Sequence, residues 1–325
     1  MDKLPEPCVR IGIIGVGFMG LNHLQNLLTL QNVKVMGVTD SSKEKGEAAA
    51  RRFGVPFFAD IPSLLEQLDA VVITVPTTAH YEVTRLAVEH NIHVFVEKPF
   101  MHNMEEARSI CELIKRHPVK VQVGHVERYQ PVIQKSWEVI NWDQLVALDF
   151  TRNIPLRKQI DVDVVLAVMV HDVDLMLQAV KIKNTKVLAF QALGTCSYAS
   201  SLRRNLIDTA FVQAQLADGT VTRLMANRAG ALSRREVYFT EVNRTIIANL
   251  LDNRLTIIHR RNKQSYDIEK TVLQMPAAKP LLNEMRSFIQ AILTGREPEV
   301  NQHDGIAVME LTEQIRAQIY RKHLT

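Results

Sequence analysis

The stretch Val9-Arg-Ile-Gly-Ile-Ile14, followed directly by Gly15-Val-Gly-Phe-Met-Gly20, decides the fold of the first part of this chain. Its first six residues are rich in β-branched side chains, which favours a strand. Apolar residues then recur at helical spacing from Leu21 to Leu28, which predicts a helix. A strand, a Gly-x-Gly-x-x-Gly turn and a helix in this order are typical of a dinucleotide-binding unit.

An acidic residue completes this pattern. The stretch Val33 to Val38 is predicted to be a second strand, and Asp40 follows it, about 20 residues after the glycine turn. In such a unit Gly15 permits the tight turn and Gly17 lets the backbone approach a pyrophosphate at the positive end of the helix. Gly20 allows the helix to pack closely on the strand. The alternative is a chance cluster of glycines in a structural turn.

Asp40 also bears on the choice of cofactor. Its carboxylate can accept hydrogen bonds from both hydroxyls of an adenosine ribose, and it would repel a ribose phosphate. The sequence therefore favours NAD over NADP. Ser41, Ser42 and Lys43 follow Asp40 and could tolerate a phosphate, so NADP stays as the alternative.

Strand-like and helix-like stretches alternate up to residue 125, which predicts a doubly wound parallel sheet of the α/β class in a first domain over 1–125. The further predicted strands are Ala70–Val75, Val94–Val96 and Val119–Val123, and the helices are Lys43–Phe53, Tyr81–Glu89 and Met104–Arg116.

The pattern changes in 126–325, where successive strands without helices between them predict an α+β domain with an open mixed or antiparallel sheet. Helices are predicted at Val132–Ile140, Val164–Val180, Pro280–Leu293 and Gly305–Tyr320, and strands at Val187–Leu193, Ala210–Leu216, Val221–Ala226, Glu236–Val242 and Arg254–His259. Asp218-Gly219 and Asp252-Asn253 are predicted turns. The final helices, 280–320, have the option of packing back on the first domain.

Composition narrows the class of protein. The 325 residues are 46% hydrophobic and 23% charged, which is ordinary for a soluble globular protein of two domains. The net charge of +4 is spread over short basic pairs, so we expect no nucleic-acid partner. No long apolar run or signal peptide is present, so we expect no membrane. Cys8, Cys111 and Cys196 have neither disulfide nor metal-ligand spacing, which favours a cytoplasmic protein without a metal.

A lysine stands at a chemically favourable point of the predicted sheet. In Val94-Phe-Val-Glu-Lys-Pro-Phe100, Glu97 and Lys98 come just beyond a strand. Ligands of such sheets bind outside the carboxyl ends of the strands, so Lys98 can face both a nicotinamide and a substrate. The alternative from position alone is an ordinary surface lysine at the end of a strand.

Five segments, in order along nearly the whole chain, resemble the Gfo/Idh/MocA oxidoreductases. This resemblance implies a Rossmann domain, an open-faced second domain that packs sheet to sheet in a homo-oligomer (a dimer or a tetramer), and hydride transfer at a sugar carbon. The segments are Gly15–Gly20, Pro76-Thr-Thr-Ala-His80, Gly124-His-Val-Glu-Arg-Tyr-Gln-Pro131, Val170-His-Asp-Val-Asp-Leu175, and Gly295-Arg-Glu-Pro-Glu-Val300. In addition, Glu97-Lys98-Pro99 looks like the signature of the family.

Two segments, Gly124–Pro131 and Asp161–Leu175, look most like the branch that acts on UDP-N-acetylglucosamine or its uronic acid. That branch oxidises the 3-hydroxyl to a ketone, often so that an aminotransferase can then install an amine. The expected substrate is therefore a nucleotide sugar. Two rivals remain: a dehydrogenase of a free sugar or inositol, and a catalytically silent cofactor-binding regulatory protein of the same fold.

The resemblance also assigns roles to individual residues. Lys98 and His171 match the catalytic lysine and histidine, and Pro99 matches a position that follows a cis peptide bond. The cofactor-binding residues are expected to be Gly15, Gly17, Phe18, Met19, Gly20, Asp40, Pro76, His80, Glu97 and Lys98, and the substrate-binding residues Lys98, Arg128, His171 and Arg228.

For several of these residues a purely structural role is the alternative. His80 alone would be interpreted as a surface histidine, and Arg128 as half of a structural ion pair. An unperturbed histidine has a pKa of about 6.5, so a histidine at position 171 can exchange protons near neutrality; otherwise it is a helix histidine satisfied by a neighbour. Asp172 and Asp174 flank it, and either orients the imidazole or faces solvent.

Position 167 departs from the family pattern. Family members usually carry aspartate four residues before the histidine, on the same helix face, whereas this chain has Ala167. Asp163 is a further four residues back. The departure leaves three options: slow turnover, another partner for His171, or an altered form of an active enzyme.

The last expectation concerns phosphate contacts. The basic stretch from Ala226 to Arg235 follows a predicted strand and contains Arg228, Arg234 and Arg235, which could approach the phosphates of a UDP group. A solvated hairpin is the alternative.

Overall fold

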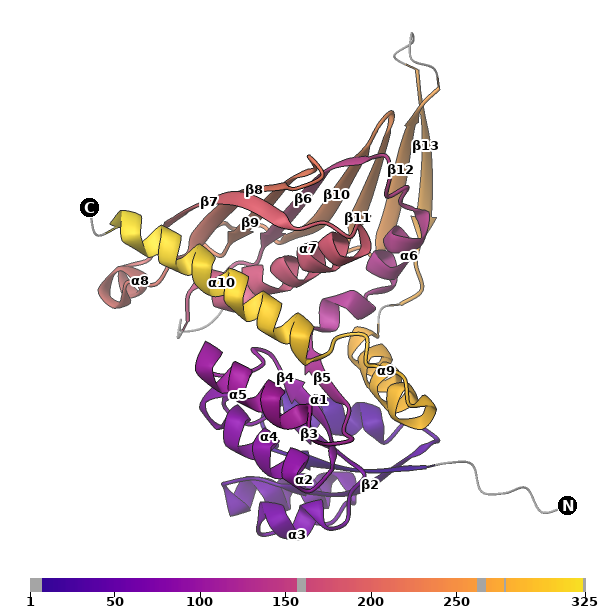
Figure 1. Cartoon of the computed structure of the whole chain (residues 1–325), viewed down its shortest axis with the longest axis vertical. Helices are drawn as coiled ribbons and strands as arrows, with labels where there is room; N and C mark the ends of the chain where they lie inside the picture. Colours follow the sequence, from indigo (N-terminus) through magenta and orange to yellow (C-terminus); the bar gives the residue numbers. More distant parts are fainter. Residues whose placement is uncertain (1–7, 157–161, 262–266, 278, 324–325) are drawn as a thin grey trace, which may run out of the picture. The chain divides into compact units, whose positions relative to one another are not determined.

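The computed structural model describes residues 8–156, 162–261, 267–277 and 279–323 (Figure 1). Asp161, the first residue of the segment Asp161–Leu175, lies outside these ranges. The chain forms two compact units. Unit 1 is Met1–Val126 with Lys279–Met309, and unit 2 is Glu127–Ala278 with Glu310–Thr325. The segment that carries the last but one helix therefore belongs to the first unit.

Unit 1 contains a parallel sheet of five strands in the order β2-β1-β3-β4-β5, which confirms the predicted doubly wound α/β fold. Strand β3 is buried along its whole length, as a strand covered on both faces should be. The strands are β1 (Val9–Ile14), β2 (Val33–Thr39), β3 (Ala70–Ile73), β4 (His93–Glu97) and β5 (Val121–Gly124).

Two helices of unit 1 begin at residues whose side chains cap the free backbone amides of the first turn. Ser42 caps α2 by accepting a hydrogen bond from the Lys45 amide, and Asn103 caps α5 in the same way from Glu106. The helices are α1 (Phe18–Leu27), α2 (Lys43–Phe53), α3 (Ile61–Leu65), α4 (His80–Glu89), α5 (Met104–Ile114) and α9 (Pro280–Thr294).

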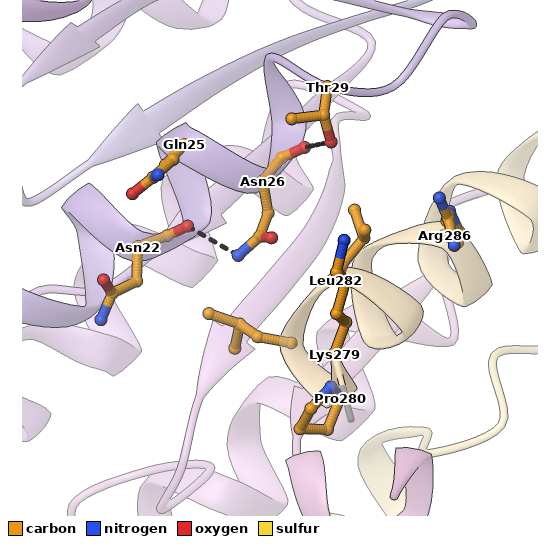
Figure 2. A pocket seen from close by; sticks show the side chains of 9 residues that line it. Asn22, Gln25, Asn26, Thr29, Lys279, Pro280, Leu282 and Arg286 are labelled. Atoms are coloured by element: carbon orange, nitrogen blue, oxygen red, sulfur yellow. Dashed lines mark hydrogen bonds between the residues drawn. The ribbon is translucent and has the colours of Figure 1, made fainter. Parts of the chain in front are cut away.

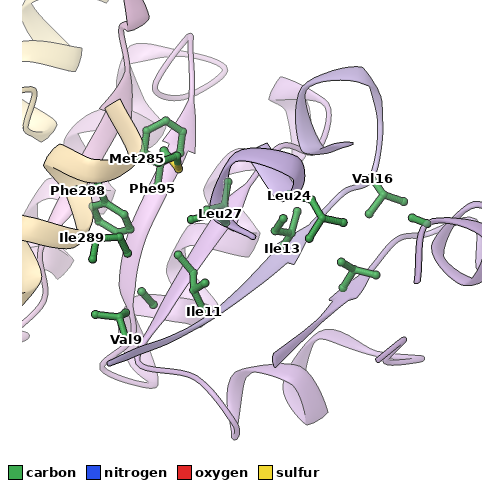
Figure 3. Packing of buried hydrophobic residues seen from close by; sticks show 14 of the residues in the cluster. Val9, Ile11, Ile13, Val16, Leu24, Leu27, Phe95, Met285, Phe288 and Ile289 are labelled. Carbon is green, nitrogen blue, oxygen red and sulfur yellow. The ribbon is translucent and has the colours of Figure 1, made fainter. Parts of the chain in front are cut away.

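The hydrophobic core of unit 1 contains side chains from two distant parts of the sequence, namely β1 with α1 and the much later α9. Ile11 and Ile13 of β1 pack with Leu24 and Leu27 of α1, and Phe288 of α9 packs into the same cluster (Figure 3). All five side chains are fully buried. Burial of each such side chain stabilises the fold by about 1.5–3 kcal/mol, so α9 is an integral part of this unit.

Unit 2 contains a mixed sheet of eight strands in the order β13-β12-β11-β10-β6-β9-β8-β7, which confirms the predicted open mixed sheet. Strands β6 and β9 are parallel, and the other neighbours are antiparallel. The strands are β6 (Leu145–Asn153), β7 (Val187–Thr195), β8 (Thr209–Leu216), β9 (Val221–Asn227), β10 (Arg234–Glu241), β11 (Arg244–Asn249), β12 (Arg254–Arg260) and β13 (Ile268–Gln274).

Helices α6 (Pro131–Val139) and α7 (Val170–Ile182) cover one face of this sheet, where α7 contacts β6 and β9 (Figure 1). A single π-turn, Val165–Met169, leads into α7. Helix α8 (Ala199–Arg204) lies between β7 and β8, and α10 (Gln302–His323) ends the described chain. In the described ranges, no helix is long and apolar enough to cross a membrane.

Three strands and two short helices of the structure are absent from the sequence expectations: β6, β11, β13, α3 and α8. Strand β13 is exposed on both faces, so it carries little of the alternation that marks a half-buried strand. Helix α3 has five residues, which is too short for a helical period to show. The predicted turns at Gly219 and Asn253 are present, and both residues have positive φ angles.

Candidate active site

The glycine turn of unit 1 is shaped by three different constraints. Gly15 has a φ angle of +92°, and a Cβ atom there would lie 2.9 Å from the Thr74 backbone. A Cβ atom on Gly20 would lie 2.0 Å from the Gly15 carbonyl oxygen. At Gly17 a Cβ atom would meet nothing within 4 Å. The outer glycines are therefore required by the fold, and the middle one leaves the backbone open to a bound pyrophosphate.

Asp40 follows β2 and is held rigidly. One carboxylate oxygen accepts a hydrogen bond of 2.8 Å from the Val16 amide in the glycine turn, and the other accepts one of 2.8 Å from the Ser42 amide. Each oxygen has a second lone pair, so the carboxylate can still accept from ribose hydroxyls. The residue predicted to bind the ribose is thus fixed against the turn predicted to bind the pyrophosphate.

A cavity of about 590 Å³ lies at this edge of the sheet, within the size range of ligand sites. Gly15, Gly17, Asp40 and Pro76 line it, as predicted for cofactor contacts, together with Ile14, Thr39, Ser41, Lys45, Ala59, Asp60, Ile61, Thr74, Val75, Ala79 and Val83. Phe18 and Met19 are not among the lining residues, and Phe18 is 82% exposed. Because the glycines, the acid and the cavity all suit a dinucleotide, these residues would hold NAD.

A second cavity, also of about 590 Å³, lies between α1 and the start of α9 (Figure 2). Six of its nine lining residues have polar side chains, and Lys279 and Arg286 are the charged ones. The Asn26 amide donates to the Asn22 carbonyl oxygen at 2.9 Å, so part of this surface is committed to the helix itself. None of the residues predicted to bind cofactor or substrate lines it.

Lys98 stands on a turn that immediately follows β4, the strand that ends at Glu97. The Lys98-Pro99 peptide bond is cis, as predicted. The Glu97 carboxylate accepts a hydrogen bond of 2.8 Å from Nε2 of His23 and one of 3.2 Å from the Lys98 amide. Glu97 was expected to contact the cofactor, but the structure uses its carboxylate to connect the turn to α1.

His80 requires a correction. It is only 1% exposed, so the interpretation as a surface histidine is wrong. Its Nδ1 lies 2.9 Å from the Pro99 carbonyl oxygen and 3.3 Å from that of Phe100, and its Nε2 lies 3.1 Å from that of Val75. Burial lowers the pKa of His80, and the three carbonyl oxygens oppose this. Both ring nitrogens therefore face backbone carbonyls, which leaves neither for a direct contact with a cofactor.

His171 lies in the first turn of α7, in unit 2, and is followed by two buried aspartates, Asp172 and Asp174. Asp172 accepts hydrogen bonds from Arg152, at 3.0 Å from Nε and 2.7 Å from Nη2. Asp174 accepts from Arg128, at 2.9 Å from Nε and 2.6 Å from Nη2. Both aspartates are thus committed to arginines, and the suggestion that they face solvent is wrong.

Arg152 belongs to a larger buried charge network that also contains Asp172. Glu127 lies 3.4 Å from Nη1 of Arg152 and also pairs with Arg235. Burial alone would raise the pKa of Glu127, but the two arginines outweigh it and hold the pKa below its usual value. For Asp172 burial dominates and raises the pKa. Arg128 pairs with Asp174. This pairing supports the interpretation of Arg128 as half of a structural ion pair over a direct contact with substrate.

Arg228 also needs a correction. It is 6% exposed, and its Nε donates to Asp208 at 2.8 Å. Its Nη1 donates to the Val162 carbonyl oxygen at 2.7 Å and its Nη2 to that of Ile207 at 3.1 Å. All three nitrogens are thus engaged within the fold, so Arg228 is not retained as a phosphate contact. Arg234 is half exposed and pairs with Glu236 at 2.7 Å.

Ala167 falls within the π-turn that precedes α7. The Val170 amide bonds to the carbonyl oxygen of Val165, five residues back, so the simple four-residue helical spacing is stretched here. Asp163 is fully buried and accepts from Nε of Arg316 at 2.7 Å and from the Tyr320 hydroxyl at 3.1 Å. Asp163 is therefore committed to the end of α10.

Glu127, Arg152 and His23 were not singled out by the sequence reasoning. Glu127 is adjacent to Arg128 in the segment Gly124–Pro131, and its charge in that segment could have indicated a functional residue. No sequence pattern indicated Arg152, because it lies on β6, a strand that the sequence did not predict. His23 falls among the apolar residues of α1, where a buried histidine is a signal of a specific partner.

Comparison with known proteins agrees with this geometry. Residues 9–125 match the model of the Gfo/Idh/MocA oxidoreductase family with an NAD-binding Rossmann fold. Residues 9–125 therefore form an NAD-binding Rossmann domain of this family. The relatives of the chain are dehydrogenases that act on CH–OH groups, and its cofactor is NAD. The described residues contain no cluster of histidine, cysteine and acidic side chains that could hold a metal ion.

Among the relatives that match over more than 90% of this chain, one is named for a nucleotide sugar. It is the UDP-N-acetylglucosamine 3-dehydrogenase of Acidithiobacillus ferrooxidans, 26% identical over 96% of this chain and 97% of its own. A solved structure of that enzyme has a TM-score of 0.86 and covers 96% of this chain and 98% of its own. The scyllo-inositol 2-dehydrogenase of Bacillus subtilis is 35% identical, but over 39% of this chain and 38% of its own.

Proposed function

We propose that this enzyme uses NAD to oxidise a hydroxyl, the 3-hydroxyl, of a UDP-sugar such as UDP-N-acetylglucosamine. The observation that carries the proposal is the extent of the similarity to the Acidithiobacillus enzyme, which spans both units and 96% of the chain. A match confined to unit 1 would support a shared cofactor but would give no support for a shared substrate. Over both units the Acidithiobacillus enzyme is 26% identical, whereas the myo-inositol 2-dehydrogenase of Thermotoga maritima is 23% identical over 91% of the chain.

The chemistry assigned to this chain's residues is proton transfer. Bound NAD supplies the nicotinamide carbon that accepts the hydride from the sugar. Lys98 presents an ammonium group beside the carboxyl edge of the sheet, where it would hold the substrate hydroxyl and stabilise negative charge on its oxygen. His171 would take the hydroxyl proton, and general base catalysis of this kind contributes roughly a hundred- to ten-thousand-fold.

The fixed groups around these residues fit the proposal. The turn that carries Lys98 is bonded to α1 through Glu97, so its backbone is preorganised. Asp172 and Asp174 are committed to arginines, which fixes the first turn of α7 and with it the backbone of His171. Position 167, where the family pattern has an acid, supplies no carboxylate here, and we propose that turnover is slow for that reason.

The test is a panel of UDP-sugars with NAD, followed by the absorbance of NADH, with and without a coupled aminotransferase. UDP-N-acetylglucosamine is expected to support NADH formation, and removal of the ketone by the aminotransferase is expected to increase its yield. NADH formation with inositol or a free sugar, and none with any UDP-sugar, would replace this proposal. That second candidate is favoured by the 35% identity to the inositol enzyme.

We also propose that the chain forms a homo-oligomer through the second face of the eight-stranded sheet. Figure 1 shows α6 and α7 on one face of that sheet, and the exposed apolar residues Leu188, Leu193, Phe211 and Val221 come from its strands. Exposed apolar side chains gathered on a sheet are typical of an interface. Light scattering at several protein concentrations would test this, since a monomer at all of them would contradict it.

A further inference from the structure

Two buried histidines hold the turn Glu97–Phe100 from different elements. The first, His23, lies on α1 and is fully buried. Its ring meets Phe95 edge-on, with the centroids 5.0 Å apart, and its Nε2 donates to the Glu97 carboxylate at 2.8 Å. The other oxygen of Glu97 accepts from the Lys98 amide at 3.2 Å. A continuous chain of hydrogen bonds thus runs from α1 to the backbone of Lys98.

The second histidine, His80, is the first residue of α4 and approaches the same turn with its Nδ1. That nitrogen lies 2.9 Å from the Pro99 carbonyl oxygen and 3.3 Å from that of Phe100. Its Nε2 lies 3.1 Å from the carbonyl oxygen of Val75, which lines the cofactor cavity. His80 therefore connects the Lys98 turn to the loop that follows β3.

Packing alone does not explain these two residues. Each ring is enclosed by the protein, and burying a polar ring costs free energy unless it is hydrogen-bonded. An apolar side chain of similar size would fill the space without that cost. What a histidine adds at each site is a directed donor: Nε2 of His23 donates to Glu97, and His80 donates to Pro99 in the tautomer that carries its hydrogen on Nδ1.

We propose that His23 and His80 are positioning residues that fix the Lys98 turn relative to α1 and to the Val75 loop. Helix α1 begins at Phe18 within the glycine turn, whose Gly15 and Gly17 line the cofactor cavity, and the Val75 loop lines the same cavity beside Pro76. The two histidines place the Lys98 backbone in a constant relation to both. The proposal rests on the proposed function for its kinetic readout only.

The experiment uses paired substitutions that separate a donor from a space-filler. The Gln side-chain amide reaches about where His Nε2 lies, so His23→Gln keeps the donor to Glu97, and His23→Leu fills the space without one. At position 80, Asn matches Nδ1 and Gln matches Nε2. His80→Asn therefore keeps the contact with Pro99, and His80→Gln keeps only the contact with Val75. His90→Leu, at an exposed histidine of the same region, is the matched control.

Three quantities are measured on each full-length variant. They are kcat, the affinity for NADH, and the rate of backbone hydrogen exchange of the peptide 97–101. His23→Leu and His80→Gln are expected to lower kcat by up to about a hundredfold, since small misplacements of a catalytic group cost that much. NADH affinity is expected to stay unchanged, and exchange of the peptide to become about tenfold faster. His23→Gln, His80→Asn and His90→Leu are expected to resemble the parent.

Equal kcat and equal exchange for the two members of each pair would overturn the proposal. If His23→Leu fails to fold, the His80 pair still decides, because its two amides have similar polarity and differ in the contact that they keep. If the parent oxidises no UDP-sugar, the proposed function fails, and hydrogen exchange alone decides the role of the histidines.

Discussion

The buried pair of Arg128 and Asp174 provides a sharp test of how unit 2 holds the start of α7. Asp174 is fully buried and Arg128 is 2% exposed, and the guanidinium makes hydrogen bonds of 2.6–3.0 Å with the carboxylate. Arg128→Met leaves the carboxylate buried without this cation. Removing one partner of such a pair costs about 3–5 kcal/mol. For a unit of this size that corresponds to a fall in Tm of roughly 6–20 °C.

Thermal and urea denaturation measure this effect, with two further variants as controls. Arg128→Met combined with Asp174→Leu removes both charges and is expected to recover most of the stability, since replacing a buried pair by apolar residues is often neutral. Arg234→Met breaks a half-exposed pair with Glu236 and is expected to cost less than about 1 kcal/mol.

The contrary result is equally clear for Arg128. If Arg128→Met remained within about 1 kcal/mol of the parent in stability while raising KM for the sugar nucleotide, Arg128 would be a substrate contact and the structural interpretation would be refuted. Recovery of stability but not of activity in the double variant would show that Arg128 serves both roles.

Three further predictions follow from single positions. Asp40→Ser is expected to weaken NAD binding by at least about tenfold and to improve NADP binding, measured by fluorescence titration, because it removes a charged acceptor of the ribose hydroxyls; unchanged affinities for both cofactors would contradict this. Ala167→Asp is expected to raise kcat and leave NAD affinity unchanged, because it adds a carboxylate near His171; an equal or lower kcat in a folded protein would exclude that role. Asp208 accepts from Arg228 and from the amides of Ser197 and Tyr198, which outweigh burial and lower its pKa. Its contribution to stability is therefore present above about pH 4, the unfolded value, and is lost as the pH falls through the lower folded value. Asp208→Asn should lower stability at neutral pH and reduce the further loss of stability as the pH falls below about 4, the unfolded value, in urea titrations; an unaltered pH profile would oppose this.

The sequence predicted the cofactor half of the protein well, and the reason is physical. The glycine turn and Asp40 are set by backbone constraints within one strand–turn–helix–strand unit, so their spacing is visible locally. The cis bond before Pro99 and the mixed sheet followed from the resemblance and from successive strand patterns.

The second half was harder because its decisive contacts are distant in sequence. Asp172 and Asp174 were recognised, but their partners Arg152 and Arg128 lie 20 and 46 residues away. Strand β6, which carries Arg152, was missed, and with it the network. Arg228 showed the reverse error, because a basic stretch by itself does not distinguish a phosphate site from a buried ion pair with Asp208.

The most direct test of the central claim is the initial rate of NADH formation by the full-length protein with NAD and UDP-N-acetylglucosamine, measured beside the same concentrations of N-acetylglucosamine and scyllo-inositol. We expect NADH formation with the UDP-sugar, its loss in Lys98→Met, and little or none with the two free compounds. NADH formation with inositol or the free sugar, and none with the nucleotide sugar, would contradict the claim.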